Sequence, residues 1–360
     1  MNHFNPNRLI IARKRRKYSS KELADIAGFS PITISRLEKS GNPEDETISK
    51  LAQVLNFPVS FFYGNDIDIL TKDSASFRSL KSMKAKERES ALTAGSIAFI
   101  VNDWMERNFN LPKLDLENFE ANNDPINAAK VLRQQWGLGE RPIVNVVKLL
   151  ESKGIRVFSL VENTRNVDAF SCWRNDVPYV FLNTFKTPER TRFDAIHELG
   201  HLVMHKHGPS SGKEIEFEAN TFASNFLMPV DDVSSRIRFV KSVSQLIDYK
   251  KRWGVSVAAL AYRIHKLGII SDWQYRSFCI QISQFRNEEP EGLERETSVV
   301  WELVFRELWK EGVTFDLLAK TLNLPVQEID NLLQGLMVSN HKFNKQFTLG
   351  QSNKGLRLVK

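Results

Sequence analysis

The 360-residue sequence predicts a multi-domain protein with an all-α first domain, an α+β middle domain and a small α-helical C-terminal region. Three observations support this prediction. The length of the chain and its 42% hydrophobic content are sufficient for two or three globular domains of ordinary size. Segments with helical periodicity occupy both ends of the chain. Short β-branched and aromatic segments between turn residues cluster at 154–182, where they predict the strands of a small sheet.

The first domain is expected at 1–65 and consists of short helices joined by tight turns. Ser19 and Glu22 have the spacing of a capping box, and Gly28 ends the helix that they begin. Ser30 followed by proline begins the next helix. Two short helices joined across a glycine-containing turn predict a helix-turn-helix. The stretch 7–64, with SSKELADIAGFSPITISRLEKSG as its matching part, resembles the XRE family of helix-turn-helix repressors.

This resemblance implies that the second helix of the motif binds the major groove of double-stranded operator DNA. The residues expected to reach bases are Pro31, Ile32, Thr33 and Arg36, and those expected to contact phosphates are Arg13, Ser19, Ser20 and Lys21. Pro31 and Ile32 depart from the polar residues usual at these positions, so hydrogen-bond readout rests on Thr33 and Arg36. A homodimer is expected, because such domains usually act on two-fold sites.

Positive charge is concentrated at the two ends of the chain. Residues 1–65 contain ten Lys and Arg against six acids, and residues 341–360 contain five against none, within a total of +7. Basic ends predict contact with a polyanion, and the basic run at 13–17 predicts salt-dependent affinity for DNA. The sequence has neither an apolar run long enough for a bilayer nor a signal core, which predicts a cytoplasmic protein without membrane contact.

The middle domain is expected at 77–270, after a polar linker at 66–76, with its catalytic core at 140–230. A helical segment at 188–205 contains His197-Glu198-Leu199-Gly200-His201. On a helix, this spacing puts both imidazoles on one face, within reach of a single Zn²⁺, and puts Glu198 where it can take a proton from the attacking water. Apolar neighbours predict a buried helix, in which these polar groups are costly without a metal.

The residues themselves leave the third zinc ligand open. His207 stands ten residues after His197, but Met204 replaces the glycine that a third histidine requires at the turn. A carboxylate from the helix predicted at 213–227 is the other solution. Glu216 and Glu218 flank the apolar stripe of that helix at similar angles, and Glu214 lies farther round. Periodicity alone does not choose between Glu216 and Glu218.

The strings HELGHLVMH and EANTFASNFLMP resemble the signature of the ImmA/IrrE family of zinc metallopeptidases. The likeness covers residues 75–270 and includes FRSL near its start and VFLN before the metal helix. It implies a zincin-like fold in which His197, His201 and Glu218 bind zinc and Glu198 is the general base. These positions are intact, so an active zinc endopeptidase is expected. His205 also matches the family pattern and is expected to support a ligand or to pack rather than to bind zinc.

The group that stabilises the oxyanion is not singled out by the sequence. The candidates are Tyr179, Tyr262, His205 and His207. In zincin folds the strand before the metal helix lies at the sheet edge. Residues 179–183 are therefore expected either to pair with an extended substrate peptide or to form an ordinary core strand.

A helical C-terminal domain is expected at 290–340, followed by a basic tail at 341–360. Within it, 312–336 has the spacing of a second helix-turn-helix, for which DNA binding, dimerisation and substrate docking all remain open. The two resemblances together predict a DNA-binding regulator that cleaves a repressor or antitoxin, or itself, to control a prophage, stress or toxin–antitoxin locus. The alternatives are a non-proteolytic XRE repressor or antitoxin whose zinc domain is structural or sensory, and a general peptidase without DNA binding.

Overall fold

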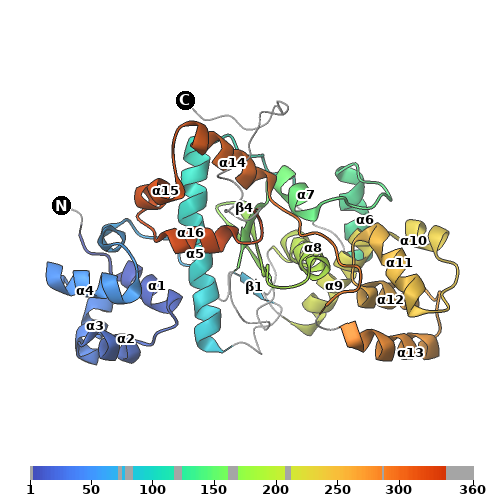
Figure 1. The fold of residues 1–360 in the computed structure, drawn as a ribbon, viewed down its shortest axis with the longest axis horizontal. Coiled ribbons are helices and arrows are strands. Elements are labelled where there is room, and N and C mark those ends of the chain that lie inside the picture. The colour runs from blue at the N-terminus through green and yellow to red at the C-terminus, as the bar shows by residue number, and fades with distance from the viewer. Residues whose placement is uncertain are drawn as a thin grey trace.

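The computed structural model describes residues 3–71, 75–77, 84–116, 124–160, 169–206, 212–285 and 288–337. A helical N-terminal domain lies at one end of the molecule, a sheet with helices on both sides lies in the middle, and a helical bundle lies at the other end (Figure 1). Among the described residues, none of the helices is both long enough and apolar enough to cross a bilayer.

The N-terminal domain contains the predicted short helices. They are α1 (Pro6–Arg15), α2 (Ser20–Ala27), α3 (Pro31–Lys39), α4 (Asp45–Leu55) and the 3₁₀ turn η1 (Val59–Tyr63). The capping box at the start of α2 is confirmed, because Ser19 and Glu22 each accept a hydrogen bond from the backbone N–H of the other. Gly28 follows α2 with φ of 67°, a left-handed conformation that glycine adopts without strain. The helix-turn-helix is therefore formed by local sequence signals.

A four-stranded sheet forms the middle of the molecule, in the order β1-β3-β4-β2. The strands are β1 (Ala75–Phe77), β2 (Arg156–Ser159), β3 (Phe170–Arg174) and β4 (Val177–Leu182). β3 and β4 form a hairpin through Asn175 and Asp176, both at positive φ, and β2 pairs with β4 in parallel. β4 is thus an inner strand with both edges paired, so of the two alternatives for 179–183 the core strand is correct for 179–182, the part that lies in β4.

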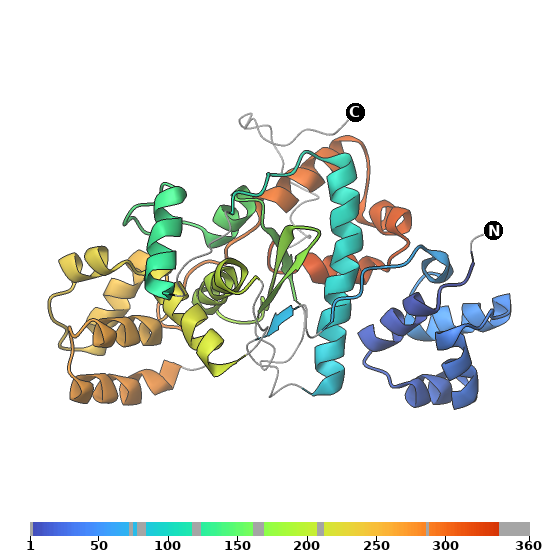
Figure 2. The same cartoon turned by 180° about the vertical axis from the view of Figure 1, so that it is seen from behind.

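Alternation along the strands divides the sheet between two cores. Phe158, Phe170 and Phe181 belong to a cluster with the long helix α5 (Ala85–Asn108), and Gly95 of α5 lies close to the last two rings. Val157 and Val180 belong to a second cluster with α8 (Pro188–Met204) and α9 (Lys213–Leu227). The sheet therefore separates α5 from the α8–α9 pair, as Figure 2 shows from behind.

The remaining helices extend the second cluster or return to the first. They are α6 (Pro125–Gln135), α7 (Val146–Ser152), α10 (Val230–Arg236), α11 (Val243–Trp253), α12 (Val257–Lys266), α13 (Asp272–Ile282), η2 (Ser283–Phe285), α14 (Val299–Lys310), α15 (Phe315–Leu322) and α16 (Val326–Leu333). Helices α10–α13 form the bundle at the far end (Figure 1). The structure describes 66–71 and 75–76 of the predicted linker 66–76. Residues 75–76 belong to β1, and 66–71 is mostly exposed but anchored, because Ile67 and Leu70 are buried and the Leu70 N–H donates to Ser96 Oγ.

Helices α14–α16 form the C-terminal region and pack against the N-terminal domain. Their apolar residues share one core with α1 and α5, and Glu328 of α16, 1% exposed, pairs with Arg15 at the end of α1 and with Arg16, which follows it. The segment 312–336, which has helix-turn-helix-like spacing, therefore packs against other parts of the same chain. The same contacts correct the prediction for two residues of the basic run 13–17, because Arg15 and Arg16 are directed toward the C-terminal region.

Glu328→Gln is expected to lower the free energy of unfolding by about 3–5 kcal/mol at neutral pH, because it leaves two arginines beside a buried site without their counter-charge. Burial alone would raise the pKa of Glu328, but Arg15 and Arg16 outweigh it and hold the pKa below the ordinary 4.5. This contribution to stability is therefore present above about pH 4.5 and is lost as the pH falls through the lower folded-state pKa. Urea unfolding of the wild type and the variant across this pH range measures both effects.

The exposed Glu311→Gln serves as the matched control and should leave the unfolding curves unchanged. Equal stability of wild type and Glu328→Gln at every pH would show that the Glu328 pair does not hold the two regions together.

Candidate metal centre

Helix α8 carries the predicted motif on a buried helix. Thr187 accepts a hydrogen bond from the Arg190 N–H at its start, and Pro188 occupies the first turn. The helix continues through Met204, in agreement with the absence of a glycine turn, and His207 lies outside the described residues. His197 and His201 are one turn apart on the face toward α9, 1% and 4% exposed.

His197, His201 and Glu216 bring their ligand atoms together. The Nε2 atoms of the two histidines are 3.1 Å apart, and the Glu216 carboxylate lies 3.3 Å from His197 Nε2 and 3.7 Å from His201 Nε2. Ligands about 2.0–2.1 Å from a tetrahedral zinc are separated by about 3.3 Å from one another. The spacing of the three donors therefore fits a single zinc ion.

The hydrogen bonding of these groups leads to the same conclusion. Both carboxylate oxygens of Glu216 and the Nδ1 atom of His197 are buried without a hydrogen-bond partner in the described part of the chain. A buried carboxylate without a donor or cation is costly, and a metal ion supplies the missing charge. Two imidazole nitrogens and one carboxylate would hold zinc with its fourth position open, which is the donor set of catalytic zinc sites.

The close crossing of α8 and α9 decides which glutamate reaches the histidines. A Cβ atom at Gly200 would lie 3.0 Å from the Phe222 ring and 3.4 Å from the Cα atom of Ala219, so the two helices touch at this point. Glu216 is one turn before Ala219 and shares its face. The structure thus places Glu216 in the cluster, and it does not place Glu218 there, although the family resemblance implied Glu218 as the ligand.

Glu218 instead ends a chain of hydrogen bonds behind His201. His205 Nε2 is 2.8 Å from Glu218 Oε2, and His205 Nδ1 is 3.1 Å from His201 Nδ1. If His201 Nε2 is kept deprotonated for zinc, its Nδ1–H donates to His205 and the Nε2–H of His205 donates to Glu218. The geometry thus places His205 and Glu218 where they can orient His201.

Glu198 faces the sheet beside this cluster. It is 1% exposed, and its Oε2 accepts a hydrogen bond of 2.7 Å from the Ser171 hydroxyl on β3. Sequence reasoning missed Ser171, because one serine within a strand has no distinguishing pattern. The hydroxyl fixes the orientation of the carboxylate that the motif assigns to proton transfer.

Two of the predicted oxyanion donors lie elsewhere. Tyr179 is 1% exposed and belongs to the α5 side of the sheet, where its hydroxyl accepts a hydrogen bond from Asn102. It is therefore on the opposite face from α8, and the prediction that it serves as an oxyanion donor is wrong. Tyr262 of α12 has its ring beside that of Tyr275 in the bundle. Of the described candidates, His205 alone contacts the metal-site residues, and its ring nitrogens are both engaged as described above.

The exposed face of α3 carries most of the predicted base-contacting residues. Pro31, Ile32 and Arg36 are exposed, Ile32 to 80%, and Thr33 is half-buried with its hydroxyl 2.8 Å from that of Ser30. Lys39, one turn beyond Arg36, is exposed on the same side and was not predicted. These residues form one surface on a helix that is long enough to enter a major groove.

The predicted phosphate contacts agree with the structure only in part. Lys21 is exposed, and Ser19 and Ser20 lie half-buried at the start of α2. Arg13 is only 8% exposed, because its guanidinium binds both carboxylate oxygens of Glu38 and donates to the Tyr18 carbonyl. Arg13 therefore holds α1 against α3, and its assignment to phosphate is corrected.

Comparison with protein families gave two matches. Residues 9–62 match the helix-turn-helix model, and residues 150–265 match the model of the IrrE N-terminal-like domain. A search of curated proteins found no match. The two matches fall on the segments that carry the sequence motifs, so the predicted fusion of the two domains is confirmed.

Proposed function

Since the chain joins a helix-turn-helix domain to an IrrE N-terminal-like domain, we propose that it is a DNA-binding regulator that hydrolyses a peptide bond with zinc. The observation that carries the proposal is the convergence of His197, His201 and Glu216 with Glu198 beside them. The exposed α3 surface in the same chain supplies the DNA-binding part.

Each residue of the site has a separate role in the proposed reaction. Zinc, when bound, would polarise the scissile carbonyl and make water more acidic. Glu198 accepts the proton of the attacking water and returns it to the leaving amine, and the Ser171 hydroxyl holds its carboxylate in place. His205 and Glu218 keep the proton of His201 on Nδ1, so that Nε2 remains a ligand.

The substrate that fits this combination is a regulatory protein, namely a repressor or an antitoxin. A peptidase that shares a chain with an operator-binding domain is brought to the place where such proteins act. Cleavage of the partner, or of the chain itself, would then change expression of a prophage, stress or toxin–antitoxin locus. We further propose that the chain acts as a homodimer on a two-fold operator.

The proposal is tested by incubating the zinc-loaded protein with the proteins encoded beside its gene and searching for a specific cut by mass spectrometry. Protein stripped of metal is the matched control. A cut that appears equally without metal would contradict the zinc mechanism. Operator release in cells that persists when cleavage is abolished would instead favour the non-proteolytic regulator.

Arg36→Ala is expected to weaken binding of the protein to its own promoter by roughly 10- to 100-fold. It should also relax discrimination at one base pair. Lys21→Ala should weaken binding equally on all sequences and reduce the slope of log affinity against log salt by about 1, because it removes a phosphate contact. Fluorescence anisotropy with promoter and scrambled duplexes at several salt concentrations distinguishes the two effects.

Lys310→Ala, an exposed change on α14, is the control and should alter neither quantity. Full discrimination between promoter and scrambled DNA by Arg36→Ala would contradict the proposal that α3 binds in the major groove.

A further inference from the structure

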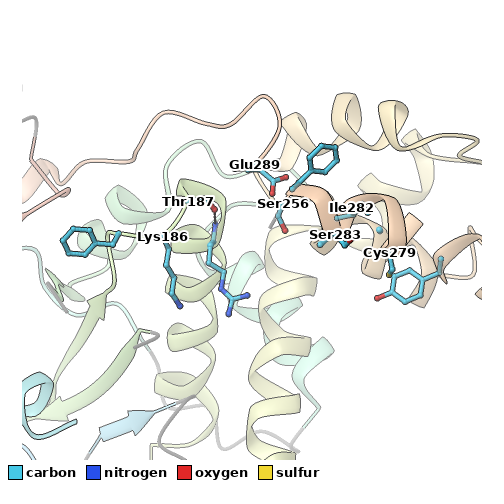
Figure 3. A pocket seen from close by; sticks show the side chains of 13 residues that line it. Lys186, Thr187, Ser256, Cys279, Ile282, Ser283 and Glu289 are labelled. Carbon is cyan, nitrogen blue, oxygen red and sulfur yellow. Dashed lines mark hydrogen bonds between the residues drawn. The ribbon is translucent and has the colours of Figure 1, made fainter. Parts of the chain in front are cut away.

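A cavity of about 600 Å³ lies at the N-terminal end of α8, between this helix and α12, α13 and η2 (Figure 3). Thr187 and Ser256, which cap α8 and α12, both line it. Thr187 precedes His197 by ten residues, which corresponds to about 15 Å along a helix. The cavity is therefore separate from the candidate metal centre, and its volume is that of a small-molecule site.

The polar wall of the cavity contains two basic side chains. Lys186 and Arg190 line it, and both pair with Asp194, which orients them along α8. Among the described residues of the lining, Glu289 is the only acid, and its carboxylate already accepts the Val257 N–H and lies 3.3 Å from the Lys250 ammonium. The Glu289 carboxylate thus already occupies the N-terminal end of α12. The N-terminal end of α8 also lies at the cavity, so the place that favours an anionic group is beside Lys186 and Arg190.

The opposite wall is apolar and largely aromatic. Tyr275, Ile282 and Phe285 line it from α13 and η2, and Phe185, which is 50% exposed, borders it on the α8 side. Tyr275 is fixed by stacking on His265, with 4.4 Å between ring centroids. Aromatic walls of this kind suit a flat apolar body, which stacks on them or meets their edges.

We propose that this cavity binds a small molecule with an aromatic body and a single anionic group, a carboxylate or a phosphate. The anionic group binds at Arg190 and Lys186 beside the start of α8, and the rings lie against Tyr275 and Phe285. The site shares no residue with the metal cluster or with the N-terminal domain.

The cavity also borders the segment that leads to the C-terminal helices. Beyond Glu289, the Leu293 N–H donates to Glu189 of α8, and Arg295 donates to the carbonyl of the cavity residue Lys186. The segment then leads into α14, the first of the three C-terminal helices. The last of them, α16, carries Glu328, which pairs with Arg15 of α1. A ligand in the cavity thus contacts the start of the connection between the bundle and the N-terminal domain.

Isothermal titration calorimetry of the full chain with 1-naphthaleneacetate tests the proposal, with 1-naphthaleneacetamide as the neutral probe of the same shape. The acetate should bind at least roughly tenfold more tightly than the amide, because it alone makes charge-assisted hydrogen bonds. Metal-free and zinc-loaded protein should give the same affinity, which separates this site from carboxylate binding at zinc. Equal binding of acetate and amide, or no binding of either, would overturn the proposal.

Two variants place the binding in this cavity. Ala258→Trp fills it from an exposed position of α12 and should abolish binding, and Arg190→Gln should weaken the acetate roughly tenfold without affecting the amide. Arg238→Gln, an exposed arginine outside the cavity, is the matched control. Hydrogen exchange of the wild type should show protection in 256–261 and 275–285 on binding. Binding that survives Ala258→Trp, or protection confined to other segments, would place the ligand elsewhere and contradict the proposal.

Discussion

Glu198→Gln will reduce the rate of peptide-bond hydrolysis by about 10²- to 10⁴-fold and leave zinc bound. Glutamine keeps the shape of the side chain and still accepts the hydrogen bond from Ser171, but its amide does not take a proton from water. The proposed ligands His197, His201 and Glu216 are unchanged, so the metal content should stay at one ion per chain. The measurement combines the initial rate of cleavage of the partner protein with the zinc content of the same sample.

Glu214→Gln is the matched control for this change, because Glu214 is an exposed glutamate on α9. It should retain both the full rate and the metal. A Glu198→Gln protein that cleaves at the wild-type rate would remove Glu198 from the reaction, whereas one that has lost zinc would assign Glu198 to the ligands. Both outcomes would contradict the mechanism proposed for this site.

The parts of the molecule that were predictable from the sequence are those set by local signals. The capping box of Ser19 and Glu22 joins residues three apart, and the metal motif joins His197 and His201 across one helical turn. In both cases the helix itself fixes the geometry, so a spacing in the sequence is equivalent to a direction in space. The buried character of α8 was likewise visible from its apolar neighbours.

The parts that were not predictable depend on contacts between distant elements. Arg15 and Glu328 are 313 positions apart, and no local signal shows that Arg15 and Arg16, within a basic run that resembles a DNA surface, bind a residue near the other end of the chain. Ser171 reaches Glu198 from a strand, 27 positions away. β4 is an inner strand because β2, earlier in the chain, pairs with it in parallel, and alternation along β4 places Tyr179 on the α5 side of the sheet.

The choice between Glu216 and Glu218 is the most instructive case. Both flank the apolar stripe of α9, and periodicity describes one helix without its partner. The packing of α9 against α8 distinguishes the two glutamates. The helices touch at Gly200 and Ala219, and this contact directs Glu216 toward the histidines. The two glutamates consequently have different expected effects on zinc.

Glu216→Ala is expected to lower zinc affinity by more than the roughly 10- to 100-fold that the loss of a ligand's hydrogen-bond partner costs, because it removes a ligand. Glu218→Ala should fall within that smaller range, since it acts through His205 on the orientation of His201. His205→Phe should reproduce the effect of Glu218→Ala, and the double variant should be little worse than either, because both act through one chain of hydrogen bonds.

Competition with a chromogenic chelator measures the zinc affinities of these four variants, with Glu214→Ala as control. A larger loss for Glu218→Ala than for Glu216→Ala would make Glu218 the ligand, as the family resemblance implies, and would show that α9 rotates when zinc binds.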